Sequence, residues 1–152
     1  MEKSQILIVD DELIIRESLA AWLQRDGHQI EALASGEDAL QRLQEKRFDI
    51  LFLDENMPGM SGIETLAKVK NLQPNLPVVM ITKSEEEAIM EDAIGSNISD
   101  YLIKPVNPNQ ILLSVKKNLE KKKLRSEKAT ISYQQEFSKI GSEISSSLDW
   151  EE

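Results

Sequence analysis

The chain has 152 residues, a formal net charge of −9 and no cysteine. This length allows one domain of about 120 residues with an appendage and excludes a second large domain, while the absence of cysteine excludes disulfides and thiol chemistry and leaves carboxylates as the expected reactive groups. The acidic balance argues against direct nucleic-acid binding, and because the chain has neither a run of about 18 apolar residues nor a basic, apolar start, we expect a cytoplasmic protein without membrane insertion.

Two kinds of apolar pattern alternate along the chain. Short, nearly unbroken apolar runs predict strands, of which the run at residues 48–54 is expected to be buried on both faces, and the loose alternation over residues 28–34 allows a further strand. Apolar residues three and four apart predict helices with one buried face. In chain order, the predicted strands cover residues 5–9, 28–34, 48–54, 76–82 and 100–104, and the predicted helices cover residues 13–26, 35–46, 62–72, 84–94 and the segment from 107 onward. Strands that alternate with helices in this way predict an α/β fold with a doubly wound, five-stranded parallel sheet.

Turn and cap residues mark several of these boundaries. Gly27 is a natural C-terminal stop for the first helix, and Ser35 is the predicted N-cap of the second. The single histidine, His28, lies between a helix and a strand, where we expect it to be solvated. The apolar face predicted for the third helix comprises Ile63, Leu66, Ala67 and Val69.

Polar residues follow four of the five predicted strands, at their carboxyl ends. They are Asp10 and Asp11, Asp54, Thr82, and Lys104. In open α/β sheets the crevice beyond these ends binds ligands, and carboxylates gathered there repel each other unless a divalent cation binds or a pKa rises. Oxygen ligands without histidine or cysteine favour Mg²⁺. A cation, a lysine and a hydroxyl around one carboxylate suit phosphoryl transfer onto that carboxylate.

The chain resembles the receiver domain of two-component response regulators. The stretches that carry the resemblance are Val9-Asp10-Asp11-Glu12, Leu53-Asp54-Glu55-Asn56-Met57-Pro58-Gly59-Met60-Ser61-Gly62, Ile81-Thr82 and Tyr101-Leu102-Ile103-Lys104-Pro105. The resemblance covers residues 5 to about 122. It implies a flavodoxin-like (CheY-like) receiver domain over residues 1–122, with residues 123–152 as a helical extension or linker. It also implies that Asp54 accepts a phosphoryl group from a sensor histidine kinase, and that the chain catalyses only its own phosphoryl transfer and autodephosphorylation.

The same resemblance implies a role for each polar residue at the strand ends. Asp11, Asp54 and the Asn56 carbonyl would hold Mg²⁺, with Asp10 acting through water. The residues implied to contact the phosphoryl group or to switch with it are Thr82, Lys104 and Tyr101.

Plainer interpretations of these residues stay open. Asp54 could cap a turn, Thr82 could cap the following helix, and Lys104 could be an ordinary strand-end lysine. Tyr101 could be a core residue with a solvated hydroxyl, as tyrosines near sheet edges commonly are. Lys83 departs from the small residue that family members often have there, which leaves the phosphoryl lifetime open.

Apolar residues continue beyond residue 119 at irregular, helix-like intervals. They predict an amphipathic helix that needs a partner, either a second copy in a phosphorylation-dependent homodimer or a following output domain. Residues 80–87, 89–96 and 106–110 also resemble PorX-like regulators, which join a receiver, a helical segment and a PglZ phosphatase-like domain and serve type IX protein secretion. That resemblance implies an output domain beyond Glu152, and we expect the chain to continue into it.

Three functions are compatible with these patterns. The first is a phosphorylation switch in which the phosphoryl group on Asp54 changes conformation and oligomeric state. The second is a Mg²⁺-dependent phosphatase with an aspartyl nucleophile, which commonly needs an acid two residues beyond the nucleophile, where this chain has Asn56. The third is a receiver-like adaptor that docks through its helical tail.

Overall fold

The predicted fold is confirmed in a computed structural model of the chain, which describes residues 4–86, 98–121, 123 and 124. Five parallel strands form one sheet in the order β2-β1-β3-β4-β5. The strands are β1 (Gln5–Val9), β2 (Gln29–Leu33), β3 (Ile50–Asp54), β4 (Val78–Thr82) and β5 (Asp100–Ile103). The helices are α1 (Leu13–Arg25), α2 (Gly36–Glu45), α3 (Gly62–Leu72) and one over residues 108–121.

Two predicted segments fall largely outside this description. Of the helix predicted over residues 84–94, only residues 84–86 are described, and of these 85 and 86 are helical. The tail beyond residue 124 is not described either. Within the described ranges, no helix combines the length and the apolar character needed to span a bilayer.

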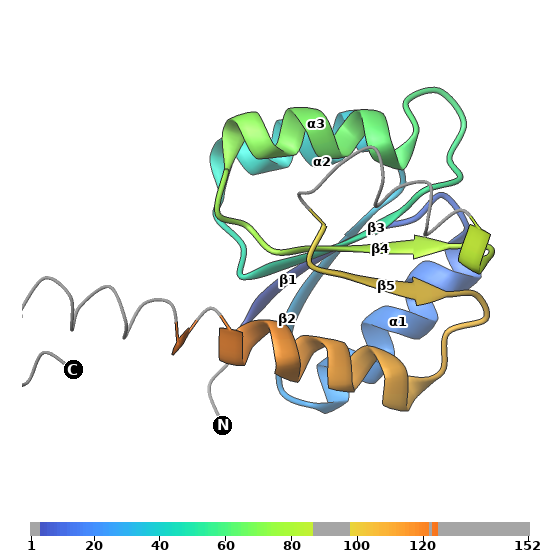
Figure 1. Ribbon diagram of the computed structural model, residues 1–152, viewed down its shortest axis with the longest axis vertical. Coiled ribbons are helices and arrows are strands. Elements are labelled where there is room, and N and C mark those ends of the chain that lie inside the picture. The colour runs from blue at the N-terminus through green and yellow to red at the C-terminus, as the bar shows by residue number, and fades with distance from the viewer. Residues whose placement is uncertain (1–3, 87–97, 122, 125–152) are drawn as a thin grey trace, which may run out of the picture. The chain divides into compact units, whose positions relative to one another are not determined.

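Helices cover both faces of the sheet (Figure 1). α2 and α3 lie on one face, and α1 and the helix that begins at residue 108 lie on the other. Side chains alternate along each strand, so Leu51 and Leu53 of β3 enter the core under α2 and α3, while Ile50 and Phe52 enter the opposite core. Every residue of β3 is therefore buried, as its unbroken apolar run predicts.

The prediction of a solvated His28 is wrong, because the turn after α1 folds this residue back onto the helix. Gly27 has φ 94°, a conformation that favours glycine, and it reverses the chain at the end of α1. The amide of His28 then donates to the Leu23 carbonyl, and its side chain is only 4% exposed. Its Nε2 lies 3.1 Å from Oδ2 of Asp26.

The buried face of α3 also differs from the prediction at two positions. Ala67 is exposed, whereas Thr65 is fully buried and donates from Oγ1 to the Ser61 carbonyl at 2.7 Å. α2 approaches so closely that a Cβ added at Gly36 would overlap the Thr65 hydroxyl. The inward face of α3 is thus set by the approach of α2, which apolar spacing alone does not report.

An ion-pair cluster ties edge strand β2 to α2. Glu31 of β2 accepts hydrogen bonds from Arg42 at 2.7 and 2.9 Å and from Lys46 at 2.8 Å. These bonds, with that from Arg42 contributing most, lower the pKa of Glu31 to about 2. The cluster therefore stabilises the fold only while Glu31 is ionised.

Replacing Glu31 by glutamine tests this contribution. At pH 7 we expect E31Q to lower the free energy of unfolding by about 1 kcal/mol, because the cluster is partly exposed and screened by solvent. The ordinary pKa of this carboxyl is 4.5, so the stabilisation is complete above that pH and is lost as the pH falls toward about 2. Urea unfolding at pH 7 and at lower pH measures the free energy of unfolding of both proteins. The difference between the unaltered protein and E31Q should become smaller only below pH 4.5.

Glu45→Gln is the matched control. Glu45 is 58% exposed and makes one contact of 3.2 Å with the same Arg42. We expect a smaller loss for E45Q than for E31Q. Equal losses for the two variants would contradict the assignment of the stabilisation to Glu31.

Candidate functional site

The sheet register brings the predicted polar residues to one edge. Asp54, the last residue of β3, pairs with Ile81 of β4. Asp10 directly follows β1, the neighbour of β3 on its other side. Thr82 is the last residue of β4, and its carbonyl accepts a hydrogen bond from the Lys104 amide at 2.8 Å. Residues far apart in the sequence thus meet because parallel strands end together.

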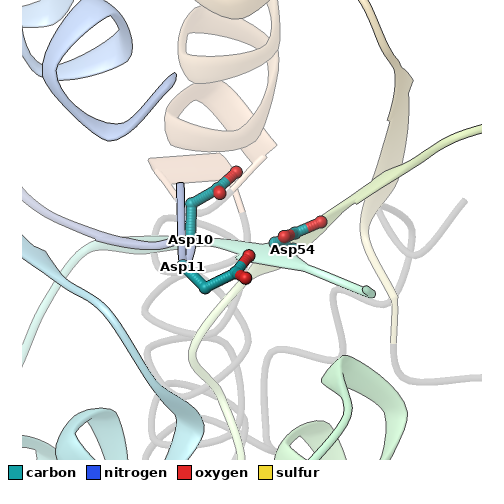
Figure 2. Close-up of side chains that lie close together, drawn as sticks. All are labelled: Asp10, Asp11 and Asp54. Carbon is teal, nitrogen blue, oxygen red and sulfur yellow. The ribbon is translucent and has the colours of Figure 1, made fainter. Parts of the chain in front are cut away.

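Three carboxylates gather at this edge (Figure 2). Asp10 and Asp11 come from the segment after β1 and Asp54 from the end of β3. One carboxylate oxygen from each lies within 4.8 Å of the others. Asp10 and Asp54 are fully buried, whereas Asp11 is exposed. The cluster therefore has a buried base and one side open to solvent.

Lys104 is the cation of the site. Its Nζ lies 3.2 Å from Asp54 Oδ1, 3.4 Å from Glu12 Oε1 and 3.7 Å from Asp10 Oδ2. Its side chain is only 17% exposed. Burial by itself would lower the pKa of Lys104, but the carboxylates of Asp54 and Asp10 outweigh this effect and raise it. Lys104 therefore stays charged and offsets part of the negative charge around it.

One lysine does not neutralise this cluster. Burial, followed by the charge of Asp10, raises the pKa of Asp54 to about 7, although Lys104 opposes the rise. Burial likewise raises the pKa of Asp10. Asp54 is therefore only partly ionised at neutral pH unless further positive charge reaches the site.

The carboxylates fit a divalent cation. Among the described residues, Oδ2 of Asp10 and Oδ2 of Asp54 are buried without a hydrogen-bond partner, a costly state for a carboxylate oxygen. The atoms of the three carboxylates that could bind a metal are all hard oxygen ligands, which suit Mg²⁺. A cation held by these residues would satisfy the buried oxygens and favour the ionised form of Asp54.

The remaining predicted residues lie around this cluster. The backbone amide of Asn56 donates to Asp54 Oδ1 at 3.3 Å. Thr82 is fully buried, and its Oγ1 donates to the Ser84 carbonyl at 3.1 Å, so the hydroxyl also bonds to the start of the following segment. Tyr101, on β5, is partly buried and packs against the core under α2 and α3. Asn56 and Thr82 thus lie at or next to the carboxyl edge, whereas Tyr101 pairs with Met80, two residues before the end of β4.

Sequence reasoning missed two residues that contact the site. Glu12 lies near Lys104, and its amide donates to Asp10 Oδ1 at 2.9 Å. Arg16 of α1 donates from Nη1 to the Asp10 carbonyl at 2.8 Å. The run of three acids could have indicated Glu12, but no pattern indicated Arg16, whose contact depends on how α1 packs.

The loop between β3 and α3 approaches the site closely. A Cβ added at Gly62 would lie 2.6 Å from the Asp54 carbonyl oxygen and 2.7 Å from the Glu55 Cα. Both atoms belong to the backbone and cannot move aside cheaply. Only glycine allows α3 to begin this close to the end of β3.

An apolar pocket adjoins the site on the α1 side. Its volume is about 430 Å³, and its lining includes Ile14, Trp22, Lys83 and Lys104. Lys104 therefore faces both the carboxylates and the pocket. Beside it, Leu13 is 55% exposed and Ile14 is 77% exposed. Exposed apolar side chains therefore lie beside the carboxylate cluster.

Comparison with known proteins gives a family match. The model of the response regulator receiver domain matches residues 6–116. Transcriptional regulatory protein ResD of Bacillus subtilis is 33% identical over 114 residues, which are 75% of this chain and 47% of ResD. Transcriptional regulatory protein ZraR of Klebsiella oxytoca is 31% identical over 140 residues, which are 92% of this chain and 32% of ZraR. The chain thus spans half or less of these curated relatives.

Solved structures give the same match. A CheY-like receiver domain protein from Methanospirillum hungatei has a TM-score of 0.74 at 28% identity, covering 82% of this chain and 99% of that one. Chemotaxis response regulator CheY4 of Vibrio cholerae has a TM-score of 0.71 at 33% identity, covering 78% and 100%. NtrX from Brucella abortus has a TM-score of 0.80 at 29% identity, covering 86% of this chain and 30% of NtrX.

Gly62→Ala tests the close approach of α3. We expect G62A to lower the free energy of unfolding by about 1–3 kcal/mol, because the new methyl group must displace backbone on both sides of the Asp54–Glu55 peptide. Urea unfolding at pH 7 measures the loss. Gly59→Ala is the control. Gly59 has φ 79°, but a Cβ added there would meet, among the described residues, only Glu37 Oε2, at 3.6 Å. G59A should show only the cost of its backbone conformation, about 1 kcal/mol. A smaller loss in G62A than in G59A would contradict the steric argument.

Proposed function

Because the chain belongs to the family of response regulator receiver domains, we propose that it is a phosphorylation switch whose acceptor is Asp54. The observation that carries this proposal is a buried Asp54 carboxylate, 3.2 Å from Lys104 and beside two further carboxylates. A buried nucleophile with a fixed cation beside it suits transfer of a phosphoryl group, because catalysis of that reaction consists of positioning and charge neutralisation.

The transfer proceeds by exchange of one bond to phosphorus. A carboxylate oxygen of Asp54 bonds to the phosphorus of a phosphohistidine on the sensor kinase, while the P–N bond breaks and its electron pair returns to the imidazole. Lys104 contacts the transferred oxygens and compensates their charge. Asp11, Asp54 and the Asn56 carbonyl would hold Mg²⁺, with Asp10 acting through water. When bound, the ion supplies charge neutralisation at the phosphoryl oxygens.

The switch uses the hydroxyl of Thr82. In the present structure this hydroxyl donates to the Ser84 carbonyl. To donate to a phosphoryl oxygen instead, it must release Ser84, which frees the start of the segment after β4. Tyr101 lies on the neighbouring strand, paired with Met80, and would change its packing in response. The phosphoryl group then stabilises one of two arrangements of this region.

The output lies beyond the receiver domain. We place the receiver in residues 1–122 and a helical extension in residues 123–152, acting in the cytoplasm through a phosphorylation-dependent homodimer or a following output domain. The curated relatives are named as transcriptional regulators. The PorX-like stretches support type IX secretion as the regulated process. On either view, this chain catalyses only its own phosphoryl transfer and dephosphorylation.

Two other functions are less well supported. A phosphatase with an aspartyl nucleophile commonly needs an acid two residues beyond Asp54, where Asn56 stands, and turnover of a phosphomonoester would support it. An adaptor that docks through its tail would show the same molar mass with and without beryllofluoride, a phosphoryl mimic. The buried acceptor beside Lys104 favours the switch over both.

The phosphodonor approaches over the N-terminal turn of α1. Leu13 and Ile14 expose apolar surface there, and the adjoining pocket shares Lys104 with the acceptor site. A kinase segment that presents a phosphohistidine to Asp54 must come close to Lys104, so it would cover this surface. Burial of apolar side chains at this contact would stabilise the complex.

Asp54→Asn tests the acceptor. We expect D54N to lose all labelling by radioactive acetyl phosphate in the presence of Mg²⁺, because the amide is not a nucleophile for phosphorus. The far-ultraviolet circular dichroism spectrum should stay unchanged. Asp49→Asn is the control, since Asp49 lies at the opposite end of β3, where its Oδ2 accepts from the Gln5 amide, and it should label normally. Labelling retained in D54N would rule out Asp54 as the acceptor.

A double variant tests the docking surface. We expect Leu13→Ser with Ile14→Ser to slow phosphoryl transfer from the cognate kinase about tenfold or more, because apolar contacts are lost, while labelling by acetyl phosphate changes less than about twofold. Leu113→Ser is the control, since Leu113 is similarly exposed, at 58%, on the helix that begins at residue 108. Equal slowing by both donors would contradict a docking role.

A further inference from the structure

We propose that Glu55, a residue to which neither the sequence motifs nor the family match assigns a task, is a positioning residue for the cation and phosphoryl site. The inference rests on the proposed function. Glu55 stands between Asp54 and Asn56, the acceptor and a predicted cation ligand. It ties the chain between these two residues to β4 on one side and to α3 on the other.

Hydrogen bonds hold Glu55 through its amide, its carbonyl and its side chain. The amide donates to the Ile81 carbonyl at 3.0 Å, and the carbonyl accepts from the Gly62 amide at 3.1 Å. The side chain continues in the same direction, because Oε1 accepts from the Ile63 amide at 2.9 Å. Backbone and side chain together thus hold two consecutive amides at the first turn of α3, where a negative charge is also favoured by the helix dipole.

These bonds orient the peptide group that leads to Asn56. The Glu55 carbonyl and the Asn56 amide belong to one planar unit and point in opposite directions. The carbonyl bonds to Gly62, and the amide bonds to Asp54 Oδ1 at 3.3 Å. Rotation of this unit would break both bonds at once. The Glu55 carboxylate keeps α3 in the place where the bond to Gly62 can form.

The Glu55 carboxylate takes part in the site only indirectly. Among the described residues, the carboxylates close enough to share a cation are those of Asp10, Asp11 and Asp54. Glu55 Oε1 is instead directed to the Ile63 amide. The proposed effect on a bound cation passes through the backbone of Asp54 and Asn56.

Glu64 offers a matched control on the same helix. Its Oε1 accepts from the Ser61 amide at 2.9 Å, so it also caps α3 with a carboxylate. The Ser61 hydroxyl completes this capping box by accepting from the Glu64 amide. These bonds stay within the first turn of α3 and the residue before it. A purely structural role in capping α3 predicts similar consequences for loss of either carboxylate.

The experiment measures Mg²⁺ affinity by titration calorimetry on the full chain. Glu55→Gln and Glu55→Leu carry the same net charge, but only glutamine keeps a hydrogen-bond acceptor. We expect E55L to bind Mg²⁺ about tenfold more weakly than E55Q, as is usual when a group that orients a metal ligand is removed. Glu64→Leu and Glu64→Gln should differ from each other by less than about twofold.

Two results would overturn the inference. One is equal Mg²⁺ affinity for E55L and E55Q. The other is a difference in Mg²⁺ affinity between E64L and E64Q that is as large as the difference between E55L and E55Q. If the circular dichroism spectrum shows that E55L is unfolded, Glu55→Asp decides instead. Aspartate keeps the charge, but its side chain is one methylene shorter and does not reach the Ile63 amide. E55D should therefore bind Mg²⁺ about fivefold more weakly than the unaltered chain, and unchanged affinity would overturn the inference.

The unaltered chain distinguishes failure of the proposed function from failure of the role of Glu55. If the unaltered chain does not bind Mg²⁺ at millimolar concentration, both are overturned. Binding by the unaltered chain together with equal affinities in the Glu55 pair would overturn the role of Glu55 alone.

Discussion

Two buried carboxylates share one lysine at the carboxyl edge of the sheet, and the chemistry of this protein depends on that arrangement. Lys104 lies between Asp10 and Asp54, yet the pKa of Asp54 still rises to about 7 because the site is buried. The native fold holds this imbalance in place, since β1 and β3, which lead to Asp10 and Asp54, each have a neighbouring strand on both sides. A cation bound beside these carboxylates would supply the positive charge that the site lacks.

The same constraint explains the construction of the loop after β3. Gly62 lets α3 begin against the Asp54 carbonyl, and Glu55 and the capping box of Ser61 and Glu64 satisfy the first amides of the helix. The amides at the start of α3 are therefore satisfied within the protein. For the proposed phosphorylation of Asp54 such fixed geometry is useful, because positioning supplies most of the catalysis in phosphoryl transfer.

The surface around the carboxylate cluster has features of its own. Leu13 and Ile14 expose apolar area beside the pocket, and Lys83 lines the pocket where family members often have a small residue. These surface residues form the docking surface that we propose for the phosphodonor. The chain spans only part of its curated relatives, whose named roles as transcriptional regulators belong to proteins with further regions outside the receiver.

The sequence by itself determined the fold class, the order of the elements and the residues at the strand ends. Unbroken apolar runs that end at Asp10, Asp54 or Thr82 report burial and position together, because parallel strands finish at one edge. Only the tertiary structure decided the burial of His28 and Thr65, the contact of Arg16 with Asp10, and the hydrogen bond between the Glu55 side chain and α3. Each of these depends on the direction of a turn or on the approach of a second element, and local sequence patterns carry no information about either.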